Sequence, residues 1–135
     1  MILIVDDCKG IGTGLRAMLK AEGLASEWVE SGEDALAWLS SRTARLVILD
    51  QCMPGMSGLD FLRHLRGSES LKGIPVIMNT ATATYEDQQE AERLGVAAYL
   101  QKGSDRWCDM ATLVMQHALD ADETVGIVPD SGQQP

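Results

Sequence analysis

Short apolar runs alternate along the chain with longer stretches in which apolar residues recur at every third or fourth position. A continuous apolar run is typical of a strand that is buried on both faces, whereas the wider spacing is typical of a helix with one apolar face. The runs predict five strands, at Ile2–Val5, Ala25–Val29, Leu46–Leu49, Ile74–Met78 and Val96–Leu100.

The intervening stretches predict five helices. The first contains the apolar residues from Ile11 to Leu19 and ends before Gly23. The next three each begin at a serine or threonine that stands three residues before an aspartate, a spacing typical of helix caps. These pairs are Ser31 with Asp34, Ser57 with Asp60, and Thr84 with Asp87. The fourth helix is expected to end at Gly95, and the fifth to extend from about Asp105 to Leu119.

The alternation of buried strands with helices predicts the fold. Strands that are apolar on both faces belong to a parallel sheet with helices on each side. Because the crossovers between parallel strands are right-handed, we expect a doubly wound α/β protein, a flavodoxin-like three-layer sandwich. Its five-stranded parallel sheet has the order 2-1-3-4-5 and is covered by five helices. Residues 1–120 form this domain, and residues 121–135, which are acidic and then contain Gly, Pro and Gln, form a tail or linker.

Composition and charge narrow the functional classes. The 135 residues suffice for one domain, and 20 acidic against 11 basic residues give a net charge of −9. This charge repels nucleic acids and anionic lipids, so we expect no direct nucleic-acid or membrane binding. No apolar run reaches the ~20 residues of a membrane span, and no signal peptide is evident, so the cytoplasm is expected. Cys8, Cys52 and Cys108 show no paired spacing that would predict disulfides or structural zinc.

Polar residues with distinct chemistry follow the predicted strands. Asp6 and Asp7 come after the first strand, Asp50 after the third, Thr80 after the fourth and Lys102 after the fifth. The carboxyl ends of parallel strands meet at one edge of the sheet, where ligands bind in this fold. Three neighbouring carboxylates require a counter-charge, and Mg²⁺ prefers such oxygen ligands. A carboxylate nucleophile, a metal ion, a hydroxyl and a lysine together indicate phosphoryl transfer.

A glycine cluster after the first strand is a candidate phosphate-binding loop. Gly10, Gly12 and Gly14 lie between a strand and a helix, but Leu15 occupies the position of the third glycine of a dinucleotide loop. No Gly-Lys-Ser/Thr sequence follows either. We therefore expect a loosely wound first helical turn and no cofactor site.

Four segments identify a family resemblance: "ILIVDD", "LVILDQCMPGMSGLDFL", "IPVIMNTATAT" and "GVAAYLQKG". With them, residues 1–120 resemble the receiver domain of bacterial two-component response regulators. The Asp-x-x-Met-Pro-x-Met-x-Gly pattern from Asp50 to Gly58 is the most specific element. The resemblance implies that Asp50 accepts a phosphoryl group.

The same resemblance implies a Mg²⁺ site and its ligands. Asp7 would bind Mg²⁺ directly, with Asp50 and the main-chain carbonyl of Cys52 as further ligands. Asp6 would orient the water molecules on the metal.

Three further residues have roles that the resemblance implies. Thr80 and Lys102 would hold the phosphoryl oxygens, and Tyr99 would move inward together with Thr80 on activation. One departure concerns the residue after Lys102, which is usually a proline preceded by a cis bond and is Gly103 here. A cis bond without proline costs ~3–4 kcal/mol, so we expect a trans bond that could aim the lysine differently.

The resemblance implies a phosphorylation-dependent signalling switch. A sensor histidine kinase, a phosphotransfer protein or a small donor such as acetyl phosphate would phosphorylate Asp50. The face formed by the fourth helix, the fifth strand and the fifth helix would then change shape for a downstream protein, an effector domain or a second copy in a homodimer. Such a protein is not an enzyme, except that it catalyses its own phosphoryl transfer and autodephosphorylation.

Two alternatives remain open. Gly103 allows a receiver-like interaction module that is not regulated by phosphate. An aspartate-nucleophile phosphatase is less compatible with the sequence, because it generally needs a second acid two residues after the nucleophile, where Cys52 stands. The thiols of Cys8 and Cys52 should lie near the acids, either as small packing residues or as a thiol-sensitive gate.

Overall fold

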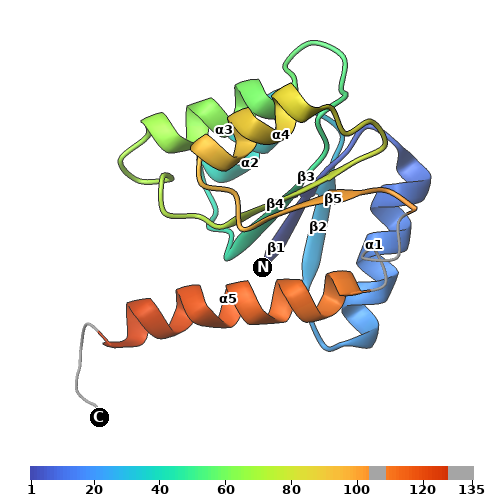
Figure 1. The fold of residues 1–135 in the computed structure, drawn as a ribbon. Helices are drawn as coiled ribbons and strands as arrows, with labels where there is room; N and C mark the ends of the chain where they lie inside the picture. Colours follow the sequence, from blue (N-terminus) through green and yellow to red (C-terminus); the bar gives the residue numbers. More distant parts are fainter. Residues whose placement is uncertain (104–108, 128–135) are drawn as a thin grey trace.

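The computed structural model describes residues 1–103 and 109–127, with side chains described up to residue 118 (Figure 1). Five parallel strands form one sheet in the order β2-β1-β3-β4-β5. The strands are β1 (Ile2–Val5), β2 (Ser26–Val29), β3 (Leu46–Leu49), β4 (Val76–Thr80) and β5 (Ala98–Gln101). The helices are α1 (Lys9–Ala21), α2 (Gly32–Leu39), α3 (Gly58–Gly67), α4 (Tyr85–Arg93) and α5 (Met110–Ile127). The predicted fold class and strand order are confirmed.

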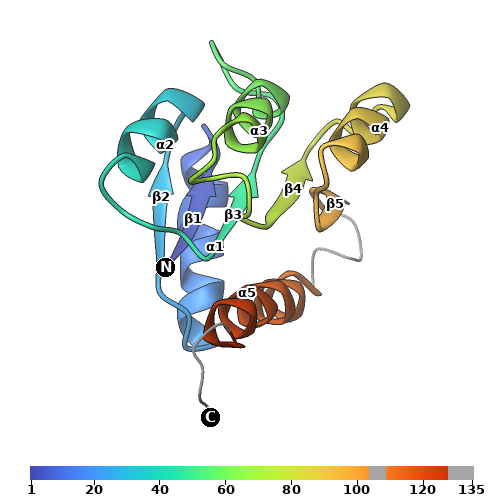
Figure 2. The same cartoon turned by 90° about the vertical axis from the view of Figure 1, so that its left-hand side faces the viewer.

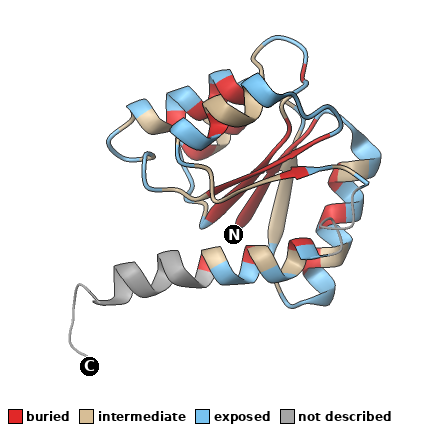
Figure 3. Ribbon diagram, viewed as in Figure 1, coloured by how far each residue is buried: buried red, intermediate tan, exposed pale blue. Residues whose placement is uncertain are grey.

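Helices cover both faces of the sheet, as Figures 1 and 2 show. Helices α2, α3 and α4 pack on one face, where Val5, Leu49 and Met78 are buried. Helices α1 and α5 pack on the other face, where Ile4 and Ile77 are buried. Strands β1, β3 and β4 are buried along their whole length (Figure 3), which explains their continuous apolar sequences.

Side-chain caps begin three of the helices, as the spacing predicts. The hydroxyl oxygens of Ser31, Ser57 and Thr84 accept hydrogen bonds from the main-chain N–H groups of residues 34, 60 and 87, at 3.0, 3.1 and 3.1 Å. At α3 the carboxylate of Asp60 also accepts from the N–H of Ser57, so the capping box is complete.

Several boundaries differ from the prediction. Strand β4 begins after Pro75 and includes Thr80, because proline has no N–H to donate to the neighbouring strand. Helix α5 continues to Ile127, into the predicted tail, since no glycine or proline precedes Gly126 in that stretch. The predicted helix start at Asp105 and the thiol of Cys108 lie outside the described residues. Among the described residues, no helix has the length and hydropathy that crossing a bilayer requires.

Helix α4 is attached to the domain mainly through polar contacts. Ala91 is its one buried residue. The guanidinium of Arg66 on α3 donates at 2.7 Å to the carbonyl of Leu94 and at 3.3 Å to that of Gly95. Arg63, also on α3, forms an ion pair with Glu90 at 3.5 Å. Polar contacts of this kind contribute less to stability than burial of an apolar face.

The three glycines after β1 lie inside helix α1, which begins at Lys9. The prediction of a loosely wound first helical turn was therefore wrong. Gly12 has a specific packing role. A Cβ atom there would lie 2.5 Å from the indole ring of Trp28 on β2. The Nε1 of this indole donates a 2.7 Å hydrogen bond to the main-chain carbonyl of Asp6. The absence of a side chain at Gly12 therefore gives the indole room to reach Asp6.

We expect Gly12→Ala to destabilise the domain by about 1–3 kcal/mol, because its methyl group displaces the Trp28 ring from Asp6. The matched control is Gly14→Ala on the same helix, where nothing lies within 4 Å of the new atom. This control should increase stability by up to ~1 kcal/mol, since alanine favours the helix. Urea unfolding measures both. An equal gain in the two variants would contradict the packing role of Gly12.

Candidate functional site: an acidic cluster at the carboxyl edge of the sheet

The predicted acids meet at the carboxyl edge of the sheet. Val5 pairs with Leu49 across β1 and β3, so the residues that follow them, Asp6 and Asp50, are neighbours. Oxygen atoms of Asp6, Asp7 and Asp50 all lie within 4.8 Å of one another. Asp6 and Asp50 are 2% and 4% exposed, whereas Asp7 is exposed to solvent. Two buried acids and one exposed acid thus form a single cluster.

Lys102 brings a positive charge into this cluster. Its Nζ lies 2.8 Å from Oδ2 of Asp6 and 3.5 Å from Oδ1 of Asp50. The main-chain N–H of Lys102 donates to the carbonyl of Thr80 at 2.8 Å, which extends the pairing of β5 with β4. Gly103 follows with φ of +79°, and no peptide bond among the described residues is cis. The expected trans bond is confirmed. Lys102 nevertheless reaches the acids, and the left-handed conformation of the next residue suits glycine.

Main-chain groups also interact with the two buried carboxylates. The N–H of Cys8 donates to Oδ1 of Asp6 at 2.9 Å, and the main-chain N–H of Cys52 opposes the rise in the pKa of Asp50. Both thiols are free and exposed, and neither belongs to the cluster of ligand atoms. Cys8 and Cys52 therefore contact the site through their backbones.

The loop after Asp50 is fixed by close backbone packing. A Cβ atom at Gly58 would lie 2.2 Å from the carbonyl oxygen of Asp50, so glycine is required there. The side-chain oxygen of Gln51 accepts from the N–H of Leu59 at 2.8 Å, and its main-chain carbonyl accepts from the N–H of Gly58 at 3.0 Å. These contacts explain physically why glycine ends the Asp50–Gly58 pattern.

The cluster changes the acidity of its members. Burial, and then the charge of Asp6, raise the pKa of Asp50 from 3.8 to about 6, although Lys102 and the N–H of Cys52 oppose this shift. Burial alone would lower the pKa of Lys102, but its hydrogen bond to Asp6 and the charges of Asp50 and Asp6 together raise it. The lysine therefore stays charged while negative charge remains in excess around it.

This donor set fits a hard divalent cation. Three carboxylates carry more negative charge than one lysine balances, and all the clustered ligand atoms are oxygens. Such ligands suit Mg²⁺ or Ca²⁺ better than a soft metal. The cluster could therefore hold a metal ion.

The other two predicted residues lie on the neighbouring strands: Thr80 ends β4, and Tyr99 on β5 pairs with Met78 of β4. Thr80 is fully buried, and its hydroxyl shares long contacts of 3.3 and 3.4 Å with the main chain of Thr82. Tyr99 packs against the core under α2, α3 and α4. Its hydroxyl is buried without a hydrogen-bond partner among the described residues, and burial raises the pKa of Tyr99.

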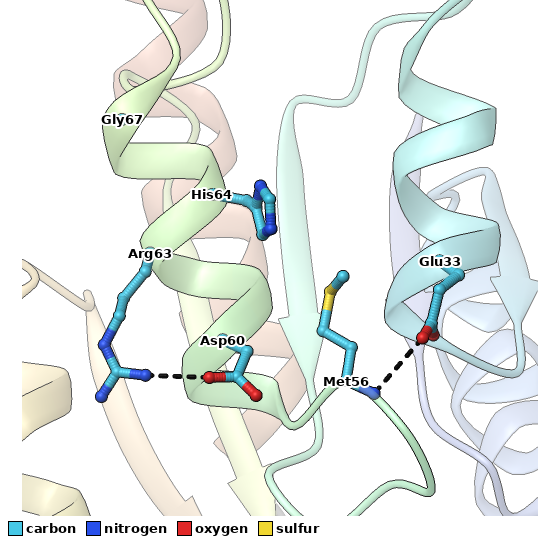
Figure 4. A pocket seen from close by; sticks show the side chains of 6 residues that line it. All are labelled: Glu33, Met56, Asp60, Arg63, His64 and Gly67. Atoms are coloured by element: carbon cyan, nitrogen blue, oxygen red, sulfur yellow. Dashed lines mark hydrogen bonds and ion pairs between the residues drawn. The ribbon is translucent and has the colours of Figure 1, made fainter.

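A hollow of about 630 Å³ lies apart from the acids, between α2 and α3 (Figure 4). In it, Glu33 accepts a 3.3 Å hydrogen bond from the N–H of Met56, and Arg63 pairs with Asp60 on an exposed surface. None of its lining residues belongs to the acidic cluster.

Trp28 is a residue near the cluster that the sequence analysis did not identify. Its indole contacts Asp6, and only the register of β2 with β1 places it there.

Known proteins resemble this chain in sequence and in fold. A family model described as the response regulator receiver domain matches residues 2–111. Chemotaxis protein CheY-3 of Vibrio cholerae is 37% identical over 102 residues, which cover 75% of this chain and 78% of that protein. Chemotaxis protein CheY of Pseudomonas aeruginosa is also 37% identical, with 75% and 82% covered. The crystal structure of a response regulator receiver protein from Pseudomonas putida has a TM-score of 0.80 at 28% identity, covering 85% and 94%.

We expect Asp50→Asn to stabilise the metal-free protein by about 1–3 kcal/mol at about pH 7, because it removes a buried charge. A folded pKa of about 6 against 3.8 means that the unfolded chain releases this proton first as the pH rises. The stability of the native protein relative to the variant should therefore fall between about pH 4 and pH 6 and then level off. Urea unfolding in a chelator measures the difference. A constant difference across this range would contradict the raised pKa.

Proposed function

The chain belongs to the response regulator receiver domain family of two-component signalling, and on that premise we propose that it is a switch in which Asp50 accepts a phosphoryl group. One observation carries this proposal. Lys102 contacts both Asp6 and Asp50 within a cluster of three carboxylates. A nucleophilic carboxylate, metal ligands and a cation are thereby gathered within a few ångströms, as phosphoryl transfer requires.

The metal in this proposal is Mg²⁺. Asp7 and Asp50 would bind it, Asp6 would orient its water molecules, and the main-chain carbonyl of Cys52 would complete the protein ligands. Exposure of Asp7 leaves one side of the cluster open to water and to a phosphoryl donor. Mg²⁺ would supply the positive charge that the transferring phosphoryl group and the three acids need.

Asp50 acts as the nucleophile. One of its carboxylate oxygens forms a bond to phosphorus while the bond between phosphorus and the donor breaks, and the leaving group keeps that electron pair. The donor is the phosphohistidine of a sensor kinase or phosphotransfer protein, or acetyl phosphate. With a pKa of about 6, Asp50 is mostly ionised near neutral pH and ready to attack. Lys102 turns from Asp50 toward the new phosphoryl oxygens and stabilises their charge.

Phosphorylation then changes the population of two conformations. The long contacts of Thr80 with Thr82 are weak, so its hydroxyl can exchange them for a phosphoryl oxygen. Tyr99 follows on the same side of the sheet. Helix α4 has one buried residue and can shift with little loss of apolar burial.

The shifted surface would recruit the next component of the pathway. The face of α4, β5 and α5 would bind a downstream protein, an effector domain or a second copy of the chain. A strongly acidic domain suits a protein partner with a basic surface better than nucleic acid or a membrane. Such a switch would act in the cytoplasm and would catalyse no reaction beyond its own phosphorylation and dephosphorylation.

With acetyl phosphate and Mg²⁺, we expect the intact protein to gain the mass of one phosphoryl group. Asp50→Asn should gain none, because an amide is not a nucleophile for phosphorus, and Asp60→Asn on the exposed surface of α3 should behave as the native protein. Mass spectrometry at mild pH measures the products. A native protein that gains no phosphoryl group would favour the interaction module, and hydrolysis of small phosphomonoesters would favour the phosphatase.

Mg²⁺ should stabilise the native protein, because it binds the folded acids and relieves their repulsion. At a concentration a hundredfold above the dissociation constant, the gain should be about 2.7 kcal/mol. Asp7→Asn should lose most of this gain, whereas Asp60→Asn should keep it. Thermal unfolding with and without Mg²⁺ tests this expectation, and an equal gain in all three proteins would place the metal elsewhere.

A further inference from the structure

Strand β4 carries a buried side-chain amide that lacks hydrogen-bond partners. Asn79 on β4 is 1% exposed, and both Nδ2 and Oδ1 lack a hydrogen-bond partner among the described residues. Its strand neighbours Val76, Ile77 and Met78 are all buried apolar residues. Leaving a buried polar group without a partner costs about 1–3 kcal/mol, and folded proteins retain few such groups. A partner in another state of the protein would explain this one.

The sheet register places Asn79 next to Asp50. Leu49 pairs with Met78 across β3 and β4, so the residues that follow them, Asp50 and Asn79, are neighbours. Ile77 faces α1 and α5 whereas Met78 faces the opposite helices. Because side chains alternate along a strand, Asn79 shares the face of Ile77. The same alternation puts Asp50 on that face, two residues after Ile48.

Lys102 passes over the end of the strand that carries Asn79. Strand β4 lies between β5 and β3 (Figure 2), and the lysine side chain reaches from the end of β5 to Asp50 and Asp6. Its side chain is 15% exposed. In the unphosphorylated protein, the ammonium group of Lys102 is the side-chain donor to Asp50. The Asn79 amide makes no hydrogen bond to a described residue.

We propose that Asn79 is a positioning residue for phosphoryl transfer: when Lys102 turns to the phosphoryl group, the Asn79 amide takes its place as donor to Asp50. The inference rests on the proposed function of Asp50. In the acyl phosphate, one Asp50 oxygen bonds to phosphorus and the other remains a carbonyl that accepts an N–H. The new hydrogen bond orients the Asp50 side chain and gives the buried Nδ2 of Asn79 a partner, which reduces the cost of burying this amide. It therefore favours the phosphorylated state over the resting state.

Beryllofluoride, which forms a stable phosphoryl-like complex on an aspartate, tests this role. Asn79→Leu keeps the approximate shape of the side chain and removes its polar atoms. With Mg²⁺ saturating, the variant should bind beryllofluoride about tenfold more weakly, as the loss of one buried hydrogen bond predicts. Mg²⁺ alone should bind within about twofold of the native affinity, because without a phosphoryl group Lys102 stays on Asp50. Titration calorimetry measures both affinities.

Two variants and one stability measurement separate positioning from packing. Ile77→Leu, a swap of similar volume on the same face of β4, should leave both affinities unchanged. Asn79→Val provides a second apolar replacement that suits a strand and should repeat the result of Asn79→Leu. Both Asn79 variants should resist urea better than the native protein, since an unpartnered amide is removed.

The outcomes are distinct. Native beryllofluoride affinity in both Asn79 variants would overturn the inference and leave the proposed function intact, with Asn79 as a destabilising amide only. Equal weakening of Mg²⁺ and beryllofluoride binding would also overturn it, because general disturbance of the site would then be the cause. A native protein that binds no beryllofluoride and takes no phosphoryl group would overturn both proposals.

Discussion

Electrostatic repulsion among three carboxylates at one edge of the sheet, partly balanced by the ammonium group of Lys102, governs the properties of the candidate site. Lys102 balances part of this charge through Asp6 and Asp50, but negative charge remains in excess, and two of the three acids are buried. The raised pKa of Asp50 is one consequence. A cation bound at the cluster would gain binding energy, because the fold already holds the three carboxylates together at a cost in stability.

The surroundings of the cluster hold it in place through very close packing. Gly58 lets α3 approach the backbone of Asp50, and Gly12 lets the indole of Trp28 reach the carbonyl of Asp6. Gly103 supplies the left-handed turn after Lys102. At each position a larger residue would move a ligand-bearing segment or strain its backbone. Glycines distant in the sequence thus serve one site.

The helices differ in how firmly they are attached to the sheet. Apolar residues anchor α1 and α3 deeply (Figure 3), whereas α4 buries only Ala91 and relies on Arg63 and Arg66. When a helix moves, water can replace its hydrogen bonds and exposed ion pairs at little cost in free energy. Water cannot compensate for apolar surface that becomes exposed. This weaker attachment supports the proposed switch, in which phosphorylation of Asp50 would move α4 more easily than the other helices.

The fold and the acids of the cluster could be predicted from the amino-acid sequence. Continuous apolar runs define buried parallel strands, the order of the helices follows, and the ends of such strands must share an edge, so Asp6, Asp50 and Lys102 were predictable. Two features depend on segments that are distant in the chain: the indole of Trp28 packs over Gly12, and the pairing of β3 with β4 brings Asn79 level with Asp50. Local patterns carry burial and periodicity, but they do not specify which side chain of one strand faces which side chain of the next. That information lies in the register of the sheet, which exists only after the strands have paired.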